Sequence, residues 1–449
     1  MTTKIPQIIL LTPDELTSQH VKRSLAAVNI LEVQTLAPSK TFVADATEVS
    51  AASQQPILII VSSTKLRRMQ LDLAEHVNSK DGTVLVWSAG SSADAKKTDP
   101  WILDRLLQQR GALLSTRLAV VIEAARLAIF FGQASPPRIK ISGRFGELGL
   151  RFKSILKDRG VQISTHKRRE QCVLSCKKNG EVQLSLPNGN ETILKDLDIS
   201  SSALSLLASA ATNETNINDK SEPYAPDTET IRLIARPPAR LLSETTSKKL
   251  AAAFGIQSGP ERLCQSPTEA SRFAGELGVP TVLKLVRPSL EHKSTQNAVA
   301  LSVENGATVR RVFHKLKSLA NDMGPPKPLG VLVAAEITGG TRIWIKTANH
   351  DFFGKLLFIG KGDNPTSAAN FVLSIPFSRS QAQNALTLIF PQNPHEETAS
   401  IANMLLNLSN LLNTLGSRIA RAEIHPMVAV GNNPAVALDA LIAISDVQP

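Results

Sequence analysis

The sequence predicts a mixed α/β protein whose N-terminal part is a doubly wound sheet covered by helices. Three short apolar runs, at 8–11, 57–61 and 83–87, are continuous and rich in aliphatic residues, as buried parallel strands are. Helical patterns lie between them, and strands that alternate with helices favour a parallel sheet. The composition agrees, because aromatic residues make up only 4% of a chain that is 42% hydrophobic.

The helices of this first domain are predicted from the spacing of their apolar residues. Helical patterns cover 16–25 and 66–77, and a longer one covers 117–131. Another helix opens at 99–100, since proline is tolerated in a first turn, where its missing N–H would have no helical partner. We therefore expect the first domain to span residues 1–134.

A second, smaller α/β unit, shorter than a complete domain of this kind, is predicted over residues 135–208, where a Pro-Pro break begins it. Strand-like segments lie at 138–142 and 161–163, and 171–198 alternates in polarity like a β-hairpin. The segment Pro-Asn-Gly-Asn at 187–190 supplies the turn of that hairpin.

A polar, turn-rich stretch at 209–229 is typical of a linker. The region 230–449 follows it as a further domain. This division suits a chain of 449 residues, because domains average about 150 residues.

Cysteine content and hydropathy predict a cytoplasmic protein. The three cysteines have no spacing that indicates a disulfide framework or a zinc site. The first residues lack a secretory signal, and no apolar run approaches the roughly 20 residues of a membrane span. We therefore expect no membrane partner.

The net charge of +11 is unevenly spread. Residues 137–179 carry twelve Lys or Arg against three acidic residues. Such a stretch forms a solvated basic face, a site for a phosphorylated small molecule, or a surface for nucleic acid. Only Phe145 and Phe152 are available there to stack on bases, which argues against nucleic acid.

The C-terminal region is marked by several short motifs in a fixed order. They are residues 242–256, 278–286, 288–294, 330–333, 339–340 and 423–427. Together they resemble the ATP-grasp domain of NDP-forming acyl-CoA synthetases, which are relatives of succinyl-CoA synthetase. The resemblance implies that ATP or ADP is clamped between two α/β lobes of the region 230–449, which deliver the γ-phosphate.

Lys284 is the first candidate ligand of the nucleotide. It lies in the middle of the apolar strand predicted at 282–286, where a lysine must reach solvent or an anion because burying it unpaired is costly. One interpretation is an edge-strand lysine that faces water. The other, implied by the resemblance, is a lysine that contacts the nucleotide phosphates.

The Pro-x-x-x-His-Lys-Ser motif adds His292, Lys293 and Ser294. In the family that it resembles, the histidine relays the phosphoryl group, and imidazole suits that step because it is nucleophilic near neutral pH. The resemblance implies that Lys293 and Ser294 bind the nucleotide. The family continues with two glycines where this chain has Asn297 and Ala298, so we expect a reshaped phosphate loop. A structural or exposed loop histidine is the alternative for His292.

The metal motif of the family is also altered. Asp439 matches an acidic ligand, but His425 stands where asparagine is expected. The resemblance implies Mg²⁺ at His425 and Asp439. Mg²⁺ prefers oxygen ligands, whereas Mn²⁺ accepts an imidazole more readily. A histidine of the loop or core is the other interpretation of His425.

Two more departures place charge where the family has its nucleotide loops. Arg342 follows a glycine pair where the family has glutamate, and Lys361 and Asp363 lie in a loop that is glycine-rich in the family. Arg342 is therefore a candidate for nucleotide binding. Alternatively, these side chains fill an emptied site with surface charge.

The N-terminal half is similar to the flavodoxin-like ligase domain of the same synthetases. Their phosphoryl-accepting histidine aligns with 91–93, where this chain has Ser-Ser-Ala, and no full CoA-binding domain is recognisable. The resemblance then implies that a partner subunit supplies the CoA-binding domain and the acceptor histidine, or that copies of the chain form a homo-oligomer.

Two functions remain open from the sequence. One is an acid–CoA ligase (ADP-forming), which interconverts acyl-CoA, phosphate and ADP with acid, CoA and ATP. The other is a catalytically silent scaffold or regulatory subunit of the same fold that binds a nucleotide or acyl-CoA.

Overall fold

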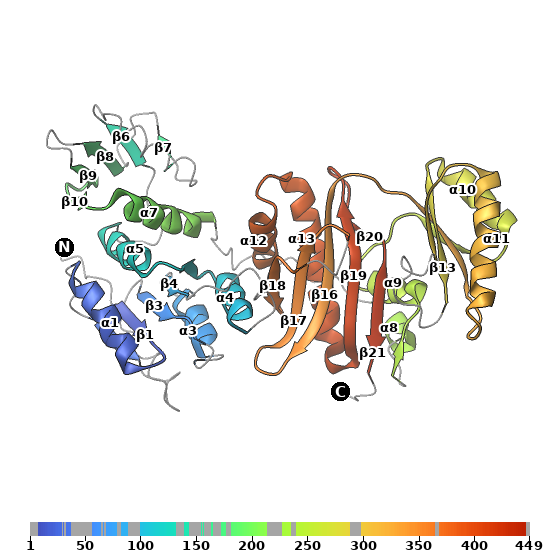
Figure 1. Cartoon of the computed structure of the whole chain (residues 1–449), viewed down its shortest axis with the longest axis horizontal. Helices are drawn as coiled ribbons and strands as arrows, with labels where there is room; N and C mark the ends of the chain where they lie inside the picture. Colours follow the sequence, from blue (N-terminus) through green and yellow to red (C-terminus); the bar gives the residue numbers. More distant parts are fainter. Residues whose placement is uncertain are drawn as a thin grey trace. The chain divides into compact units, whose positions relative to one another are not determined.

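The computed structural model describes residues 8–28, 30, 33–36, 56–63, 66, 69–78, 82–88, 99–131, 139–142, 154, 156, 163–164, 172–176, 181–212, 227–234, 239–287, 298–363 and 368–445. The chain divides into two compact units, 1–216 and 217–449, which Figure 1 shows in sequence colours. No helix in these ranges is long and apolar enough to cross a membrane.

In the described part of the N-terminal unit, five parallel strands form the first sheet, in the order β2-β1-β3-β4-β5. This is the strand order of flavodoxin-like doubly wound folds, so the predicted α/β class is confirmed. The strands are β1 (Ile8–Leu11), β2 (Val33–Leu36), β3 (Ile57–Val61), β4 (Thr83–Trp87) and β5 (Leu113–Ser115). The helices are α1 (Glu15–Ala26), α3 (Met69–Asn78), α4 (Asp99–Gln109) and α5 (Leu118–Phe131).

A partly buried carboxyl group lies where β3 and β4 end. Asp104 of α4 accepts hydrogen bonds from Ser62 Oγ at 3.0 Å and from Ser88 Oγ at 2.6 Å. Burial raises the pKa of Asp104 above its ordinary value, although both hydrogen bonds act to lower it. The contacts tie α4 to the carboxyl edge of the sheet.

The second sheet of this unit has the order β10-β9-β8-β6-β7. Its elements are β6 (Ile139–Ser142), β7 (Ile163–Ser164), β8 (Cys172–Cys176), β9 (Val182–Ser185), β10 (Glu191–Leu194) and the helix α7 (Leu197–Thr212). Strands β9 and β10 pair antiparallel, with Ser185 opposite Glu191, so the predicted hairpin is confirmed.

Helix α7 runs four residues into the stretch predicted as a linker. The predicted boundary at 208 therefore falls inside this helix, whose last turn contains Ala210 and Ala211, residues of high helix propensity. Both sheets belong to one compact unit, and the predicted bounds of the separate domains stay predictions.

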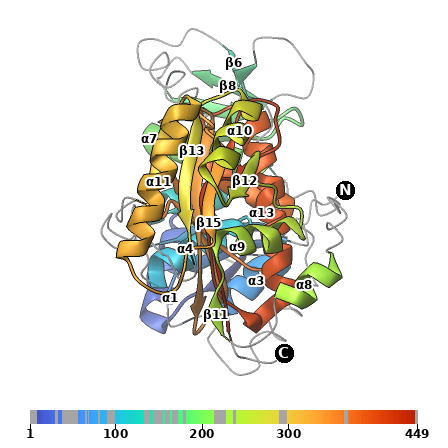
Figure 2. The same ribbon diagram turned by 90° about the vertical axis from the view of Figure 1, so that its right-hand side faces the viewer.

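The C-terminal unit begins its described part with α8 (Thr228–Ile234), β11 (Arg240–Leu241) and α9 (Glu244–Ala252). A four-stranded antiparallel sheet follows, in the order β12-β15-β13-β14. Its strands are β12 (Glu261–Cys264), β13 (Thr281–Val286), β14 (Val299–Val303) and β15 (Gly330–Ala335). The helices α10 (Pro267–Leu277) and α11 (Gly306–Asp322) cover one face and look toward the viewer in Figure 2.

Helix α10 begins and ends at residues suited to those positions. The Ser266 side chain caps its first turn by accepting from Glu269 N, and Pro267 occupies the start, where its missing N–H is harmless. Gly278 ends it with a left-handed φ of 65°. The apolar side of α10 packs on the sheet, where Phe273 is buried.

A larger antiparallel sheet completes the unit, in the order β11-β21-β19-β16-β17-β18, with β20 paired to β19. Its further strands are β16 (Thr341–His350), β17 (Gly354–Lys361), β18 (Phe371–Ser374), β19 (Ile419–Ala429), β20 (Val436–Ala437) and β21 (Ala440–Ile444). Helices α12 (Arg379–Ile389) and α13 (His395–Leu415) pack on one face through a common core, and the short helix η3 (Gly416–Arg418) leads into β19.

Candidate nucleotide site

Lys284 lies on an inner strand, with its side chain on the face opposite α10 and α11. Leu283 and Leu285 enter the core beneath these helices, so alternation along β13 directs Val282 and Lys284 to the other face. Strand β13 lies between β15 and β14, and the Lys284 side chain is 11% exposed. The interpretation as an edge-strand lysine that faces water is therefore wrong.

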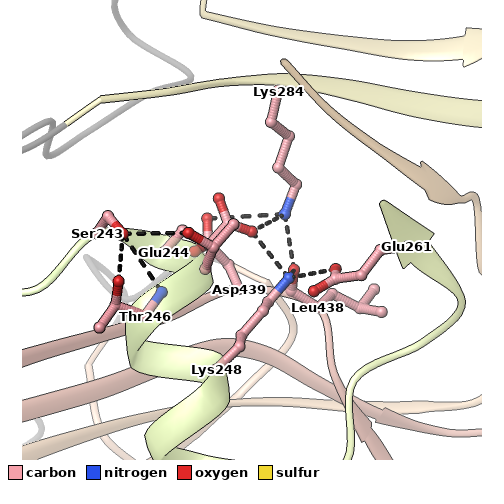
Figure 3. A network of polar contacts seen from close by, with 9 residues as sticks. Ser243, Glu244, Thr246, Lys248, Glu261, Lys284, Leu438 and Asp439 are labelled. Atoms are coloured by element: carbon pink, nitrogen blue, oxygen red, sulfur yellow. Dashed lines mark hydrogen bonds and ion pairs between the residues drawn. The ribbon is translucent and has the colours of Figure 1, made fainter. Parts of the chain in front are cut away.

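The Lys284 ammonium group is held by three oxygen atoms from other parts of the unit (Figure 3). It donates to Glu244 Oε1 at 3.1 Å and to the Leu438 carbonyl at 2.7 Å, and Asp439 Oδ2 lies 3.8 Å away. Burial by itself lowers the pKa of Lys284, but the negative charges of Glu244 and Asp439 outweigh it and raise the pKa above its ordinary value. The side chain is therefore a fixed cation.

A second lysine, Lys248, meets the same acceptors from the opposite side in Figure 3. Its ammonium group donates to Glu244 Oε1 at 2.8 Å, Glu261 Oε2 at 2.7 Å and the Leu438 carbonyl at 2.8 Å. Helix α9 presents Glu244 and Lys248 one turn apart, and Ser243 caps that helix by accepting from Thr246 N. The sequence prediction missed both charged residues, although their i,i+4 spacing lies inside the motif at 242–256.

A cavity of about 410 Å³ lies beside this network, between the four-stranded sheet and the larger sheet. Lys284 and Glu261 border it, and Arg342 and Asp363 border its other side. Its apolar lining is Val282, Val299, Leu301, Ala334, Ala335, Ile337, Pro426 and Leu438. The cavity thus combines one fixed ammonium group with apolar walls wide enough for a small molecule.

Arg342 enters the cavity from the start of β16, but it already has an anionic partner. Its Nε lies 2.6 Å from Asp363 Oδ1, and its Nη1 donates to the Ile337 carbonyl at 3.0 Å. The glycine pair before it has positive φ angles of 74° and 72°, and a Cβ on Gly340 would lie 2.1 Å from the Ala429 carbonyl oxygen. Glycine is therefore required at 340.

The turn next to Arg342 is fixed by a buried carboxylate. Glu397 of α13 accepts hydrogen bonds from Thr341 N at 2.9 Å and from Gly431 N at 2.8 Å. Burial acts to raise the pKa of Glu397, but these bonds and one from the Thr341 hydroxyl hold it below its ordinary value.

The two predicted metal ligands are neighbours through their backbones. His425 N donates to the Asp439 carbonyl at 3.3 Å, while the imidazole Nε2 lies 3.6 Å from Glu423 Oε2. The Glu423 carboxylate is already paired with two cations, because Lys346 and Arg421 both contact its Oε1 at 2.8 Å. Burial acts to raise the pKa of Glu423, but its hydrogen bonds hold it well below the ordinary value.

Asp439 and His425 suit a metal ion that also binds the phosphates of a ligand better than a metal ion that is held by the protein alone. In the described ranges, no group of three or more His, Cys, Asp or Glu side chains is arranged to hold a metal ion. Mg²⁺ commonly binds through one or two carboxylates and completes its shell with water and substrate phosphates. Asp439 offers one such carboxylate beside Lys284, whereas the His425 imidazole lies near Glu423.

Three predicted site residues, His292, Lys293 and Ser294, lie outside the described residues, as do most of the basic stretch 137–179 and the segment 91–93. Of the predicted residues that are described, Lys284 and Arg342 are brought to one cavity, and Asp439 lies beside Lys284. Their roles stay predictions.

A larger cavity, of about 870 Å³, lies in the N-terminal unit between α1, α5, the β9–β10 hairpin and the start of α7. Its central charges are mutually satisfied: Arg126 contacts both oxygens of Glu123 at 2.7 Å, and Ser200 also donates to Glu123. Because these polar groups serve each other, this cavity indicates no particular chemistry.

Comparison with known proteins agrees with the architecture of the C-terminal unit. Residues 234–444 match the ATP-grasp domain family. The β subunit of the ADP-forming acetate–CoA ligase II of Pyrococcus furiosus is 26% identical over 214 residues, which cover 45% of this chain and 90% of that subunit. The ADP-forming acetate–CoA ligase II of Archaeoglobus fulgidus is 26% identical over 216 residues, which cover 46% of this chain but only 31% of that ligase.

Among solved structures, the dinucleotide-forming acetyl-coenzyme A synthetase 1 of Ca. Korarchaeum cryptofilum, in complex with coenzyme A, is 21% identical. It matches 46% of this chain and 93% of its own, with a TM-score of 0.41. From the sequence matches, the C-terminal unit of this chain is an ATP-grasp domain, homologous to those of the ADP-forming acetate–CoA ligases.

Proposed function

We propose that the C-terminal unit binds ATP or ADP in the cavity between its two sheets, with Lys284 in contact with the phosphates. The observation that carries this proposal is the Lys284 ammonium group, which stays charged and is held at the cavity wall. The apolar wall provides a surface for the base. The volume of about 410 Å³ lies within the range of small-molecule sites, about 300–1,000 Å³.

Arg342 is the second proposed phosphate contact. It borders the cavity as a cation that Asp363 holds in place, and a guanidinium group offers further N–H donors in a fixed plane. From the resemblance alone, His292, Lys293 and Ser294 are proposed to complete the phosphate site.

The proposed metal ion is Mg²⁺, held by Asp439 and His425 together with the phosphates. When bound, the ion supplies positive charge that neutralises the phosphates. The imidazole of His425 favours Mn²⁺ over Mg²⁺, since Mn²⁺ accepts nitrogen ligands more readily. Asp439 also faces Lys284, so the carboxylate and the ammonium group lie side by side where the phosphates would enter.

The reaction class that we propose is ADP-forming acid–CoA ligation. The relatives are named as acetate–CoA ligases, and the first of them is a subunit. We propose accordingly that a partner subunit supplies CoA binding and the phosphoryl-accepting histidine. The cytoplasm is the proposed location.

A catalytically silent nucleotide-binding subunit is the second candidate, and one observation favours it. Arg342, where the family has a carboxylate, is paired with Asp363 at 2.6 Å, so the two charges satisfy each other at the cavity wall. A pair of this kind stabilises an empty site as well as a filled one.

Calorimetric titration with ATP and ADP tests the site, first with Mg²⁺ and then with Mn²⁺. The wild type should bind, and Lys284→Met should bind at least about tenfold more weakly, because a charge-assisted contact is lost. Lys249→Met is the matched control, since Lys249 is the exposed neighbour of Lys248 on α9. No binding by the folded wild type with either metal would overturn the proposal.

Phosphate exchange between ATP and ADP separates the two candidates. A ligase should show metal-dependent exchange that His292→Ala abolishes. A silent subunit should bind the nucleotide, with a rise in melting temperature, and show no exchange.

A further inference from the structure

We propose that Glu244 and Lys248, two residues of helix α9 that do not line the cavity, position the Lys284 ammonium group for the nucleotide phosphates. The inference rests on the proposed nucleotide site and extends it to a helix behind the cavity wall. The geometry that carries it is the sharing of one oxygen atom: Glu244 Oε1 accepts from Lys248 at 2.8 Å and from Lys284 at 3.1 Å (Figure 3).

Lys248 is the structural cation of the pair. An ammonium group has three N–H donors, and Lys248 places one on Glu244, one on Glu261 and one on the Leu438 carbonyl. Its side chain is 4% exposed and does not border the cavity. Its hydrogen-bonding capacity is thus used within the protein.

Lys284 is held by fewer bonds and faces the cavity. Within the described part of the chain, its ammonium group donates two hydrogen bonds, to Glu244 and to the Leu438 carbonyl. Asp439 Oδ2, at 3.8 Å, is beyond hydrogen-bonding distance. One donor of Lys284 is therefore left for a ligand in the cavity, while Glu244 and Leu438 fix the direction in which it points.

Glu244 can fix that direction because it is itself immobilised. Its side chain is 0% exposed, and it lies in the first turn of α9, next to the Ser243 cap. A lysine side chain otherwise samples many rotamers, and ordering it on binding opposes affinity. Glu244 removes that cost before the ligand arrives.

The second lysine also sets the charge that a phosphate meets. The network contains two ammonium groups against the carboxylates of Glu244, Glu261 and Asp439. Without Lys248, Lys284 would stand alone among these carboxylates, and the excess negative charge would repel a phosphate. With Lys248 present, the three carboxylates face two ammonium groups instead of one, so less negative charge opposes the attraction between Lys284 and a phosphate.

The test compares the affinities of ATP and adenosine for the full chain at saturating Mg²⁺, because their ratio isolates the contribution of the phosphates. In Glu244→Gln, the advantage of ATP over adenosine should fall at least about tenfold while adenosine affinity is unchanged. Lys249→Met should keep the wild-type ratio. A purely structural role for Glu244 would lower the melting temperature without moving the ratio, since both ligands bind only folded protein.

The outcomes separate the inference from the proposed function. If the folded wild type binds neither ligand, the nucleotide site itself is refuted. If the wild type binds both and Glu244→Gln keeps the wild-type ratio, the positioning role is refuted and the site stands. Should Glu244→Gln fail to fold, the double variant Glu244→Gln/Lys248→Met removes one charge of each sign. That variant should fold with the ATP advantage still reduced, and a wild-type ratio in it would refute the inference.

Discussion

Replacing Lys248 by methionine should destabilise the protein strongly at neutral pH. Methionine fills a similar volume but removes three hydrogen bonds, two of them to carboxylates, from a side chain that is 4% exposed. Breaking a buried ion pair costs about 3–5 kcal/mol, because the remaining charges stay buried. Glu244 would keep Lys284, and Glu261 is 17% exposed, so water compensates in part. We therefore expect a loss of about 3 kcal/mol, at the lower end of that range.

The loss should also depend on pH. Burial raises the pKa of Glu261, while Lys248 acts to lower it. In Lys248→Met this pKa rises further, so the native variant binds more protons than the native wild type. The difference in unfolding free energy between wild type and variant should therefore shrink as the pH falls from 7 toward 5.

Urea unfolding followed by circular dichroism, at both pH values, measures this effect. Lys249→Met, an exposed substitution one residue away on the same helix, should change the unfolding free energy by less than about 0.5 kcal/mol. A loss below about 1 kcal/mol in Lys248→Met, or a loss that is equal at both pH values, would refute this reasoning.

Three further substitutions test other parts of the fold. Gly340→Ala should lower the free energy of unfolding by about 1–3 kcal/mol, because φ is 72° there and the new Cβ would meet the Ala429 carbonyl. Gly275→Ala, in open space on α10, is the control and should raise the free energy of unfolding by about 0.5–1 kcal/mol. Thermal unfolding of both variants measures the difference. Glu397 has a lowered pKa, so its contribution to stability is lost as the pH falls below about 4.3, and Glu397→Gln should flatten the decline in unfolding free energy measured by urea unfolding between about pH 7 and pH 3. Asp104 has a raised pKa, so the wild type should gain stability relative to Asp104→Asn over the same fall in pH, and equal slopes would contradict this.

The N-terminal fold was predictable where the strands are continuous and apolar. Strands β1, β3 and β4 are almost entirely buried, and their nearly unbroken apolar sequences predict that burial. Strands β2, Val-Gln-Thr-Leu, and β5, Leu-Leu-Ser, are shorter or partly polar and were not predicted. They become strands by pairing with β1 and β4, which is a tertiary effect.

The candidate site was predictable only in part, because its contacts join distant segments. The sequence places Lys284 on a strand, but the two neighbours that make it an inner strand come from later in the chain. Lys284 and Glu244 are 40 residues apart, and Lys248 and Leu438 are 190 apart. Local spacing shows that Glu244 and Lys248 share one side of a helix, but it does not show what they face.

The shared acceptor of the two lysines is an atom that no side-chain substitution can delete. It is the main-chain carbonyl of Leu438, between β20 and β21, and every amino acid supplies the same atom there. Leu438 is also one of the residues that line the cavity. A substitution at this position can therefore change the cavity for a different ligand while the carbonyl that binds Lys248 and Lys284 is kept. The side chain at 438 can vary in evolution without loss of the acceptor that holds both lysines.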